Sequence, residues 1–556
     1  MKPSIKTLTF FFLLLFLTSC QTNQQSADLI VINANIWTGD QGQPRAEAMA
    51  ILGDTILAIG TSEDLDSFMG EKTRVMDAGG KFITPGFIDT HVHFLSGSYG
   101  LSSVKLRDAA TPEEFSSRIG NYAGTVAEGT WIMEGDWDHQ LWGGELPRAE
   151  WIDPVTSNHP VFVTRLDGHI SLANSKAMEL AGVDKSTPDI EGGEIVRDAN
   201  GNPTGIFKDN AQGLIYRAVT PFSAEQNDEA IINGMNYMVS NGVTTVHNMD
   251  LGASTEIIDT YGRIRDRQII RFYMAVGLSN WTQLRDKVEK EGRGDKWLKI
   301  GVLKGMVDGA LGSHTAAFFE PFTDTPGDRG FFVVDEDSLN KWAMEADKAN
   351  LQLAIHAIGD RAINTLLNVF EKVANENGPR DRRFRIEHVQ HLSPSDISRF
   401  DELGVIASVQ PYHAIDDGRW AEKVIGSERI KTTYAFKSLL DANTTVAFGS
   451  DWAVAPPTPL EGIYAATTRR TLDGANPEGW VPEQKITVEE ALRAYTINGA
   501  YSSFDENVKG KLAPGMLADF VILSEDLTKV DPVQINAMRV LQTYVGGKKV
   551  FDIDDE

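Results

Sequence analysis

The chain of 556 residues has almost no cysteine and fewer basic than acidic residues, and both shortages exclude classes of protein. Its only cysteine is Cys20, so the chain that follows has no disulfide, no thiolate metal ligand and no cysteine nucleophile. Lys and Arg number 52 against 78 Asp and Glu, which gives a formal net charge of −26 at pH 7. A surface that binds nucleic acid should be basic, so the composition argues against nucleic acid as a partner.

The first 20 residues have the pattern of a targeting segment. Lys2 and Lys6 form a short basic region, and the apolar run from Leu8 to Leu17 is too short to span a bilayer as a mature helix. The residues Leu17-Thr18-Ser19-Cys20 resemble the lipobox of bacterial lipoproteins. This resemblance implies cleavage before Cys20 and acylation of that cysteine. The alternative is an ordinary secretory signal that contains a cysteine by chance.

The residue after the cysteine indicates the membrane to which a lipoprotein is sorted. It is Gln21 rather than Asp, which in Gram-negative lipoproteins usually goes with sorting to the outer membrane. We therefore expect a lipoprotein signal peptide at 1–19 and a flexible polar tether at 20–27. The expected location is the bacterial cell envelope, with the protein lipid-anchored to the outer membrane and facing the periplasm. The anchor would be its only membrane contact.

The length of the chain predicts two or more domains. Short apolar runs separated by Gly and Asp turns indicate β-strands between residues 28 and 84, and similar runs return after residue 508. We expect 28–84 and 508–556 to build one small β-sandwich-like domain from both chain ends.

The central part of the chain alternates strand-like runs with helix-like segments. The helix-like segments include 223–241, 281–292, 337–349, 360–376 and 394–403. The strand-like runs lie at 160–164, 242–246, 270–276, 298–304, 352–356, 384–388, 405–409 and 445–449. Such alternation predicts a parallel α/β fold, and the strand count favours a TIM-type (β/α)8 barrel over 85–507.

Residues 98–220 exceed what a barrel needs between its first two strands. They contain Trp131, Trp137, Trp142 and Trp151, and their pattern indicates a hairpin near 194–201. We expect an inserted subdomain near the mouth of the barrel, with these tryptophans in its packing core; a substrate-binding wall is the alternative. The sequence leaves open whether the insert acts as a lid or as the surface of a homodimer.

The run 85–93, Pro-Gly-Phe-Ile-Asp-Thr-His-Val-His, ends in two histidines one residue apart. Residues i and i+2 of a strand point to the same face, so His91 and His93 can aim two imidazoles at one metal ion. The alternative, in a chain with 11 His, is a pair with no ligand role. Further strand-like runs end in, or are followed by, a metal-type side chain, and these residues are Lys304, His356, His388 and Asp451.

These residues resemble the ligand pattern of the amidohydrolase superfamily, and the resemblance covers nearly the whole mature chain. The run 85–93 matches the first-strand motif, 449–451 the last-strand aspartate, and 510–519 the return into the β-domain. Other features resemble the YtcJ-like branch, which includes N-substituted formamide deformylases: the large early insert, Asp167-Gly168-His169 with Asn174, the stretch 304–309, and Arg385-Ile386-Glu387-His388.

The resemblance implies a (β/α)8 barrel that holds two divalent metal ions, usually zinc. His91 and His93 would bind the more buried ion together with Asp451, and His356 and His388 would bind the second. Lys304 would bridge the two ions after losing its proton and adding CO2 to form a carbamate, because an ammonium group would repel them. The alternative is a lysine paired with a carboxylate beside a single metal ion.

The implied activity is hydrolysis of a C–N bond in a small molecule, which could be an amide, a formamide or a cyclic amide. A metal-bound water has a lowered pKa, and the resulting hydroxide would attack the substrate carbonyl. Asp451 would act as general base towards the water and then as general acid towards the leaving nitrogen. The alternatives are hydrolysis of an ester, lactone or phosphoester at the same centre, and a non-catalytic surface lipoprotein.

Weaker candidates for substrate contact follow other strand-like runs. Such positions reach the mouth of a barrel, and for His169 with Asp167 a structural hydrogen bond is the competing interpretation. These residues are Asp167, His169, His247, Gln410 and Tyr412.

Overall fold

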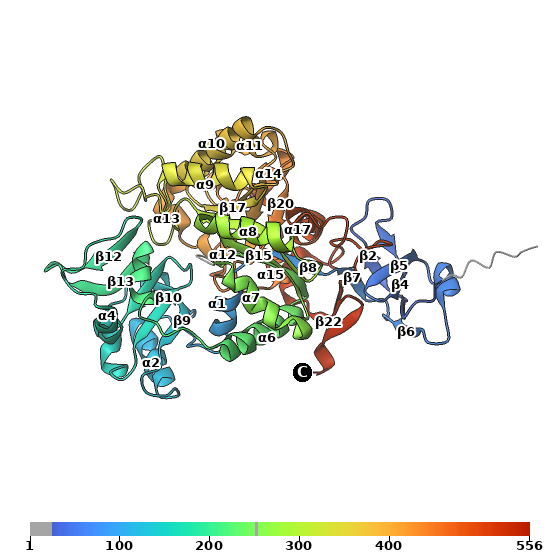
Figure 1. Ribbon diagram of the computed structural model, residues 1–556, viewed down its shortest axis with the longest axis horizontal. Coiled ribbons are helices and arrows are strands. Elements are labelled where there is room, and N and C mark those ends of the chain that lie inside the picture. The colour runs from blue at the N-terminus through green and yellow to red at the C-terminus, as the bar shows by residue number, and fades with distance from the viewer. Residues whose placement is uncertain (1–24, 251–253, 556) are drawn as a thin grey trace, which may run out of the picture.

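Eight parallel strands form the central sheet of the molecule (Figure 1). The computed structural model describes residues 25–250 and 254–555. The backbone N–H of Asp451 donates to the carbonyl of His91 at 2.7 Å, which joins the last strand to the first. This nearly closed parallel sheet confirms the predicted TIM barrel. Its strands are β8 (Phe87–Val92), β14 (Val243–Asn248), β15 (Arg271–Gly277), β16 (Leu298–Met306), β17 (Gln352–Ala357), β18 (Arg385–His388), β19 (Ile406–Val409) and β20 (Val446–Phe448).

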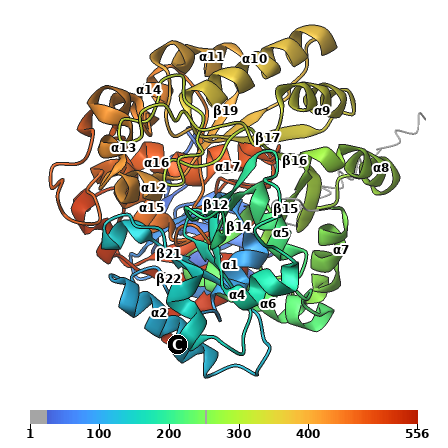
Figure 2. The same ribbon diagram turned by 90° about the vertical axis from the view of Figure 1, so that its left-hand side faces the viewer.

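Helices surround the barrel (Figure 2). They are α1 (Phe94–Gly100), α6 (Ala224–Ser240), α7 (Glu256–Arg263), α8 (Trp281–Glu291), α9 (Glu336–Lys348), α10 (Asp360–Asn377), α11 (Ile397–Glu402), α12 (Pro411–Asp417), α13 (Ala421–Arg429), α14 (Phe436–Asp441), α15 (Pro459–Thr468), α16 (Val488–Tyr495) and α17 (Ile497–Ser502).

Local sequence explains why these helices form where they do. In α10 the buried residues Ile363, Leu367 and Phe370 recur every three or four positions, so one face of the helix packs on the barrel. Helix α6 begins with a capping box, in which Ser223 and Gln226 each accept a hydrogen bond from the other's backbone N–H. The helix-like segments of the sequence are confirmed, although 394–403 divides into a 3-10 turn and α11.

One strand-like run that was counted in the α/β alternation belongs to the predicted insert and not to the barrel. The run at 160–164 forms β10 (Val161–Arg165), which pairs with β9 (Ile132–Trp137) and β11 (Ile170–Ala173) outside the barrel. The side chains of β10 are buried along its whole length, as they are in barrel strands. An apolar run of this kind does not reveal which sheet will bury it, so the sequence pattern could not separate the two.

Strand β10 belongs to the subdomain inserted between α1 and α6. Its five-stranded sheet has the order β12-β13-β11-β10-β9, in which β12 is Gly193–Arg197 and β13 is Pro203–Asp209. Trp137, Trp142 and Trp151 belong to one apolar cluster and Trp131 packs on another, which confirms the packing interpretation of these tryptophans. The helices of the insert are α2 (Pro112–Ala123), α3 (Ala149–Ile152), α4 (Ser175–Ala181) and α5 (Gly213–Tyr216).

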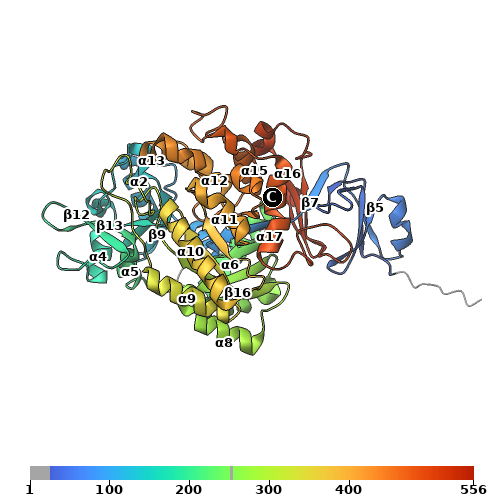
Figure 3. The same ribbon diagram turned by 90° about the horizontal axis from the view of Figure 1, so that it is seen from above.

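The two chain ends meet in a β-domain at the opposite end of the barrel from the insert (Figures 1 and 3). Strand β21 (Phe520–Leu523) pairs antiparallel with β7 (Phe82–Pro85) inside a six-stranded sheet of order β23-β22-β21-β7-β2-β3. A second sheet has the order β5-β4-β1-β6. The remaining strands are β1 (Leu29–Ile32), β2 (Asn35–Trp37), β3 (Arg45–Ala46), β4 (Ala48–Leu52), β5 (Thr55–Gly60), β6 (Arg74–Asp77), β22 (Val540–Val545) and β23 (Lys548–Asp552).

A buried ion pair links this domain to the barrel. Arg271, the first residue of β15, donates from Nε and Nη2 to the two carboxylate oxygens of Asp519 at 2.6 and 2.8 Å. The backbone N–H of Gly546 also donates to Asp519, at 2.7 Å. Both side chains of the pair are almost fully removed from solvent.

The Asp519→Ala variant is expected to lower the free energy of unfolding by about 3–5 kcal/mol, because it leaves the guanidinium of Arg271 buried without its counter-charge. Urea titration followed by circular dichroism measures the change. The control is Glu428→Ala, which removes an exposed pair with Lys431 and should cost about 0–1 kcal/mol. Equal effects in the two variants would contradict the link between the domains.

Cys20 and the predicted signal peptide lie outside the described residues. Within 25–250 and 254–555, no helix is both long enough and apolar enough to cross a membrane.

Candidate metal centre

Six side chains predicted as metal ligands converge at the carboxyl ends of the barrel strands. His91, His388 and Asp451 each present one ligand atom, and these atoms lie within 4.8 Å of one another. The ring of His93 is 5.4 Å from that of His91, and the ring of His356 is 4.5 Å from that of His388. The Nζ atom of Lys304 lies 2.9 Å from Nε2 of His91. Parallel strands bring distant residues together because their carboxyl ends share one rim.

Hydrogen bonds on the far side of three imidazoles determine which nitrogen faces the centre. His91 donates from Nδ1 to Glu387 at 2.5 Å, and His388 donates from Nδ1 to Gln410 at 2.9 Å. His356 uses the other nitrogen, and donates from Nε2 to the carbonyl of Gly309 at 3.0 Å. A neutral imidazole that donates from one nitrogen has a lone pair on the other. These bonds therefore assign lone pairs to Nε2 of His91 and His388 and to Nδ1 of His356, as metal ligation requires.

The carboxylate of Asp451 completes this donor set. Its Oδ1 is buried and accepts no hydrogen bond from a described residue, although Nε2 of His93 and of His91 lie 3.2 and 3.6 Å away. Its Oδ2 lies 3.6 Å from Nδ1 of His388. A buried carboxylate oxygen approached by imidazole nitrogens that do not donate to it is unfavourable alone. Neutral imidazoles and a carboxylate in this arrangement fit a divalent cation such as zinc.

Burial sets the charge state of most of these residues. It lowers the pKa of His91, His356 and His388 well below the ordinary value, so the three imidazoles are neutral at pH 7. For Asp451, burial would raise the pKa, but the neighbouring His91 and His93 outweigh it and hold the pKa below its ordinary value. The centre thus combines neutral imidazoles with an ionised carboxylate, which is the state in which both residue types bind metals.

Lys304 is buried in β16 and makes no ion pair with any residue in 25–250 or 254–555. Burial lowers the pKa of its ammonium to about 8. The negative charges of Glu387 and Asp451 act against this shift, so a lysine that interacts with a strand-end carboxylate stays an alternative to the carbamate.

Two of the proposed ligands have a strained backbone. His388 has φ 76° and Asp451 has φ 64°, a region that non-glycine residues rarely adopt. Such conformations cost of order 1–3 kcal/mol each and persist only where the surrounding structure enforces them. The chain therefore turns sharply at the end of β18 and after β20, where it directs these two side chains towards the centre.

A buried charged network supports the centre from inside the barrel. Glu387 accepts from Nδ1 of His91 and pairs through its other oxygen with Nε of Arg385 at 2.8 Å. Arg385 also donates to Nδ1 of His247 at 2.9 Å and to the carbonyl of Thr90 at 2.6 Å. Glu387 and Arg385 are fully buried. We did not assign a role to either from the sequence, although two charged residues two positions apart in a buried strand are a signal for such a pair.

The Glu387→Gln variant is expected to lower metal affinity by about 10- to 100-fold, because His91 loses the carboxylate that orients its ring and raises its basicity. Competition with a chromophoric chelator measures the affinity. The control is Glu371→Gln, which alters an exposed partner of Arg399 on α10. Unchanged metal affinity in Glu387→Gln would show that Glu387 does not contribute to metal binding.

The weaker candidates are distributed around the centre. Gln410 accepts from His388 and thereby orients a proposed ligand. His247 is fully buried against Arg385 and Tyr273. Tyr412 is partly buried at the start of α12. Asp167 accepts from the guanidinium of Arg165 and from the backbone N–H of His169.

His169 comes from the insert, and its ring contacts that of the proposed ligand His356. Its ring is 5.3 Å from that of His356, and its Nδ1 lies 2.5 Å from Oδ1 of Asp209. Burial would lower the pKa of His169, but the nearby carboxylate of Asp209 outweighs it and raises the pKa. Asp209 was not identified from the sequence, because nothing in the local pattern of β13 indicates that it meets a residue 40 positions earlier.

Asp308 holds the loop that follows β16 and carries Gly309. Its carboxylate accepts backbone N–H bonds from Ala317, Ile358 and Gly359 at 2.7, 3.0 and 2.9 Å. Burial nevertheless raises its pKa to about 7. The three bonds fix the position of the Gly309 carbonyl, which in turn orients His356.

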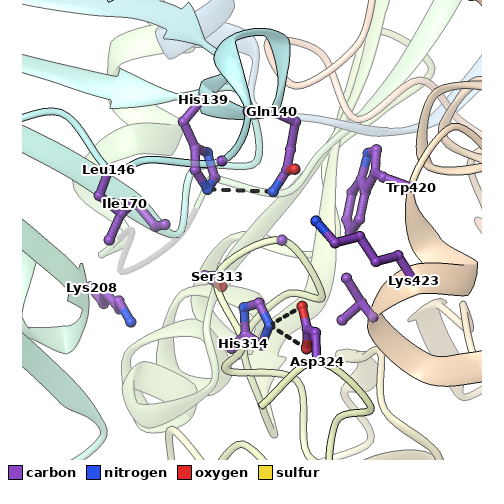
Figure 4. Close-up of a pocket in the computed structure, with 14 residues that line it drawn as sticks. His139, Gln140, Leu146, Ile170, Lys208, Ser313, His314, Asp324, Trp420 and Lys423 are labelled. Atoms are coloured by element: carbon purple, nitrogen blue, oxygen red, sulfur yellow. Dashed lines mark hydrogen bonds and ion pairs between the residues drawn. The ribbon is translucent and has the colours of Figure 1, made fainter.

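A cavity of about 290 Å³ lies between the insert, the loop after β16 and α13 (Figure 4). His139 and Gln140 line it from the insert, and Trp420 and Lys423 face them from the barrel side. Lys423 has no ion pair with a described residue. Ile170 and Lys208, which are direct partners across β11 and β13, form another part of the wall.

A (β/α)8 barrel that gathers histidines, a lysine and an aspartate at its strand ends defines the class of metal-dependent amidohydrolase barrels. The chain belongs to the amidohydrolase family, whose sequence model matches residues 74–551. It is 41% identical to Protein LONG AFTER FAR-RED 3 of Arabidopsis thaliana, over 94% of this chain and 92% of that protein. It is 28% identical to the N-substituted formamide deformylase of Arthrobacter pascens, over 94% of this chain and 98% of that one.

A crystal structure of an uncharacterized metal-dependent hydrolase from Pyrococcus horikoshii OT3 has the same fold. It matches with a TM-score of 0.74 at 26% identity, and covers 91% of this chain and 99% of the other. Together with the family match, these relatives confirm the resemblance to the superfamily and to its formamide deformylase branch.

Proposed function

We propose that the chain is a hydrolase for the C–N bond of a small amide, formamide or cyclic amide. The single observation that carries the proposal is the donor set at the strand ends, in which three imidazole lone pairs and an unbonded oxygen of Asp451 converge. The similarity to a protein named N-substituted formamide deformylase supports the choice of a C–N bond.

The six residues would hold two divalent ions, for which we propose zinc. His91, His93 and Asp451 would bind one ion, and His356 and His388 the other. Lys304, in the form of a carbamate, would bind both through its two oxygens. When bound, such ions supply Lewis acidity, which lowers the pKa of water and polarises a carbonyl group.

The protein's own catalytic contribution is proton transfer by Asp451. Its carboxylate is ionised and buried, so it can accept a proton from an attacking water and then donate that proton to the nitrogen that leaves. Glu387 and Gln410 keep the imidazoles of His91 and His388 in place during this cycle. None of the six proposed ligands lines the cavity between the insert and α13, so we do not assign the substrate to it.

A substrate panel tests the proposal. The mature protein, loaded with zinc or manganese, would be offered formyl and acetyl amides of aromatic and alkyl amines, a cyclic amide, and esters, lactones and phosphate esters of similar size. We expect amide hydrolysis by the wild type and none by the His356→Ala/His388→Ala double variant. Hydrolysis of esters or phosphates, but of no amide, would show that the enzyme does not act on a C–N bond. Activity that survives in the double variant would contradict the proposed centre.

We also propose that a lipid on Cys20 anchors the mature protein to the outer membrane, and the lipobox-like run 17–20 followed by Gln21 supports this proposal. The Cys20→Ser variant is expected to leave the membrane fraction when cells are lysed and fractionated. The control is Ser19→Ala, which keeps the cysteine and a small residue before it. Retention of Cys20→Ser in the membrane fraction would contradict the anchor.

A further inference from the structure

The cavity between the insert and α13 has the features of a second binding site. Its volume of about 290 Å³ is at the lower end of the range for small-molecule sites, which is roughly 300–1,000 Å³. Part of its wall is apolar and consists of Leu146, Ile170, Val424 and the indole of Trp420. The cavity therefore has room for a small molecule with an apolar body.

His139, in the wall from the insert, is bound to a residue that can only donate hydrogen bonds. Its Nδ1 accepts from Nε of Arg165 at 3.1 Å, and a guanidinium has no acceptor. His139 is 4% exposed, and burial together with the charge of Arg165 lowers its pKa to about 3. The neutral ring must therefore carry its hydrogen on Nε2, the nitrogen that is directed towards Gln140 in Figure 4.

The N–H of His139 meets a second donor at the cavity wall. Its Nε2 lies 3.5 Å from Nε2 of Gln140, which is an amide nitrogen without a lone pair to offer. Two such groups cannot satisfy each other, whereas an oxygen atom of a ligand could accept from both. The opposite orientation of the amide, with its oxygen towards the ring, would satisfy His139 from within the protein.

One buried carboxylate holds both donors in place. Asp138 accepts from Nη2 of Arg165 at 3.2 Å and from the backbone N–H of Gln140 at 3.1 Å. The same guanidinium binds His139 and also donates to Asp167. Asp138 and Arg165 are each 2% exposed. The two donors are thus fixed before a ligand arrives, which lowers the entropy lost on binding.

The charges at the cavity favour an anion. Lys208 pairs with Glu194 at 2.8 Å, and Asp324 is bound to Nε2 of His314 at 3.0 Å. The ammonium of Lys423 makes no ion pair with a residue in 25–250 or 254–555, and in Figure 4 it points into the cavity. Among the described residues that line the cavity, Lys423 thus provides a charge that is free to bind a ligand.

We propose that this cavity binds a small organic carboxylate. Its oxygens accept from Nε2 of His139, from the amide nitrogen of Gln140 and from the ammonium of Lys423, and its apolar body packs against Trp420. A hydrogen bond from an ammonium to a carboxylate is roughly twice as strong as one between neutral groups, so the charge of the ligand is recognised as well as its shape. The inference goes beyond the proposed function, because binding requires neither the metal ions nor hydrolysis.

Calorimetric titration of the metal-loaded mature protein with phenylacetate tests the site. Neutral 2-phenylethanol and ring-free acetate should each bind at least about tenfold more weakly than phenylacetate. Lys423→Met keeps the apolar stem and should weaken phenylacetate binding about tenfold, and Gln140→Glu should weaken it at least as much because it adds a like charge. The matched controls are Lys431→Met and Gln283→Glu at exposed positions outside the cavity, and they should leave the affinity unchanged.

Trp420 provides a second readout that reports the place of binding. Phenylacetate should change the tryptophan fluorescence of the wild type, because its ring would contact the indole that lines the cavity. In Trp420→Phe this change should be lost while calorimetry still detects binding. A fluorescence change that persists in Trp420→Phe would place the ligand elsewhere and would contradict the proposal.

Two outcomes of the titration would overturn the proposal. No binding of phenylacetate by the wild type would mean that the amide of Gln140 satisfies His139 from within the protein. Binding that is unchanged in both Lys423→Met and Gln140→Glu would show that phenylacetate occupies another site, such as the metal ions. Failure of the wild type to hydrolyse amides would contradict the proposed function but not this site, because binding is measured without substrate.

The carboxylate could belong to a separate molecule or to the far end of a long substrate, and kinetics distinguishes these sources. A separate molecule should change kcat for a neutral amide without competing with it. A substrate carboxylate would instead make phenylacetate a competitive inhibitor, and Lys423→Met would then raise KM about tenfold for amides that carry a carboxylate but not for neutral ones.

Discussion

The Asp451→Asn variant should have a kcat/KM lower than that of the wild type by about 10³- to 10⁴-fold, as expected for the loss of a group that serves as both base and acid. Asparagine has nearly the same shape, but it cannot accept a proton from water. It also removes a negative charge beside His91 and His93, which would weaken metal binding. Steady-state kinetics at saturating metal separates the two effects, because added metal restores binding but not proton transfer.

A matched control is available on α14. Asp441→Asn makes the same chemical change at an exposed carboxylate that pairs with Lys437, and it should leave kcat/KM unchanged. If Asp451→Asn kept kcat/KM within tenfold of the wild type at saturating metal, Asp451 would not be the proton carrier.

The second large effect is expected at Lys304. Lys304→Ala should lower kcat/KM by about 10³-fold or more, because the loss of a bridging ligand forfeits several kcal/mol of transition-state stabilisation. Lys304→Arg should be equally inactive, since a guanidinium keeps the positive charge but is not expected to add CO2. Added acetate should restore part of the activity of Lys304→Ala, because a small carboxylate can occupy the vacated space and supply two oxygen ligands.

The Lys304 variants also distinguish the carbamate from a simple ion pair. A lysine that acted only as a cation would be replaced in part by arginine, and carboxylate would not rescue the alanine variant. Metal content per chain, measured by mass spectrometry of the ions, should fall in both variants. Lys299→Ala is the control, because Lys299 lies at the opposite end of β16 and bonds to Asp505. Full activity in Lys304→Arg would contradict the carbamate.

The sequence predicted the barrel because its strands have two properties that are visible locally. They are apolar along their length, and most of the runs that carry ligands end in a polar metal-type residue. Parallel strands then place those ends on one rim, so His91, Lys304, His356 and His388 could be assigned to one site without knowing their distances. The run at 160–164 satisfies the first property alone; it was counted among the alternating strands, and it lies in the sheet of the insert.

The supporting residues could not be predicted in the same way. Glu387 contacts His91 across 296 positions of sequence, and Asp209 contacts His169 through a ladder inside the insert. Both contacts depend on how strands are paired and rotated, which side-chain type and spacing do not determine. Arg385 and Glu387 did carry a local signal, because two charged residues in a buried strand must find partners. Asp209 carried none.

The metal content of the purified mature protein tests the account most directly. Metal-free protein would be titrated with zinc or manganese, while bound metal and amide hydrolysis are measured on the same samples. The six-ligand centre predicts about two equivalents of ion per chain at saturation, with activity that rises as they bind and is lost on chelation. Fewer than one equivalent of bound metal, with no activity recovered by either ion, would contradict it.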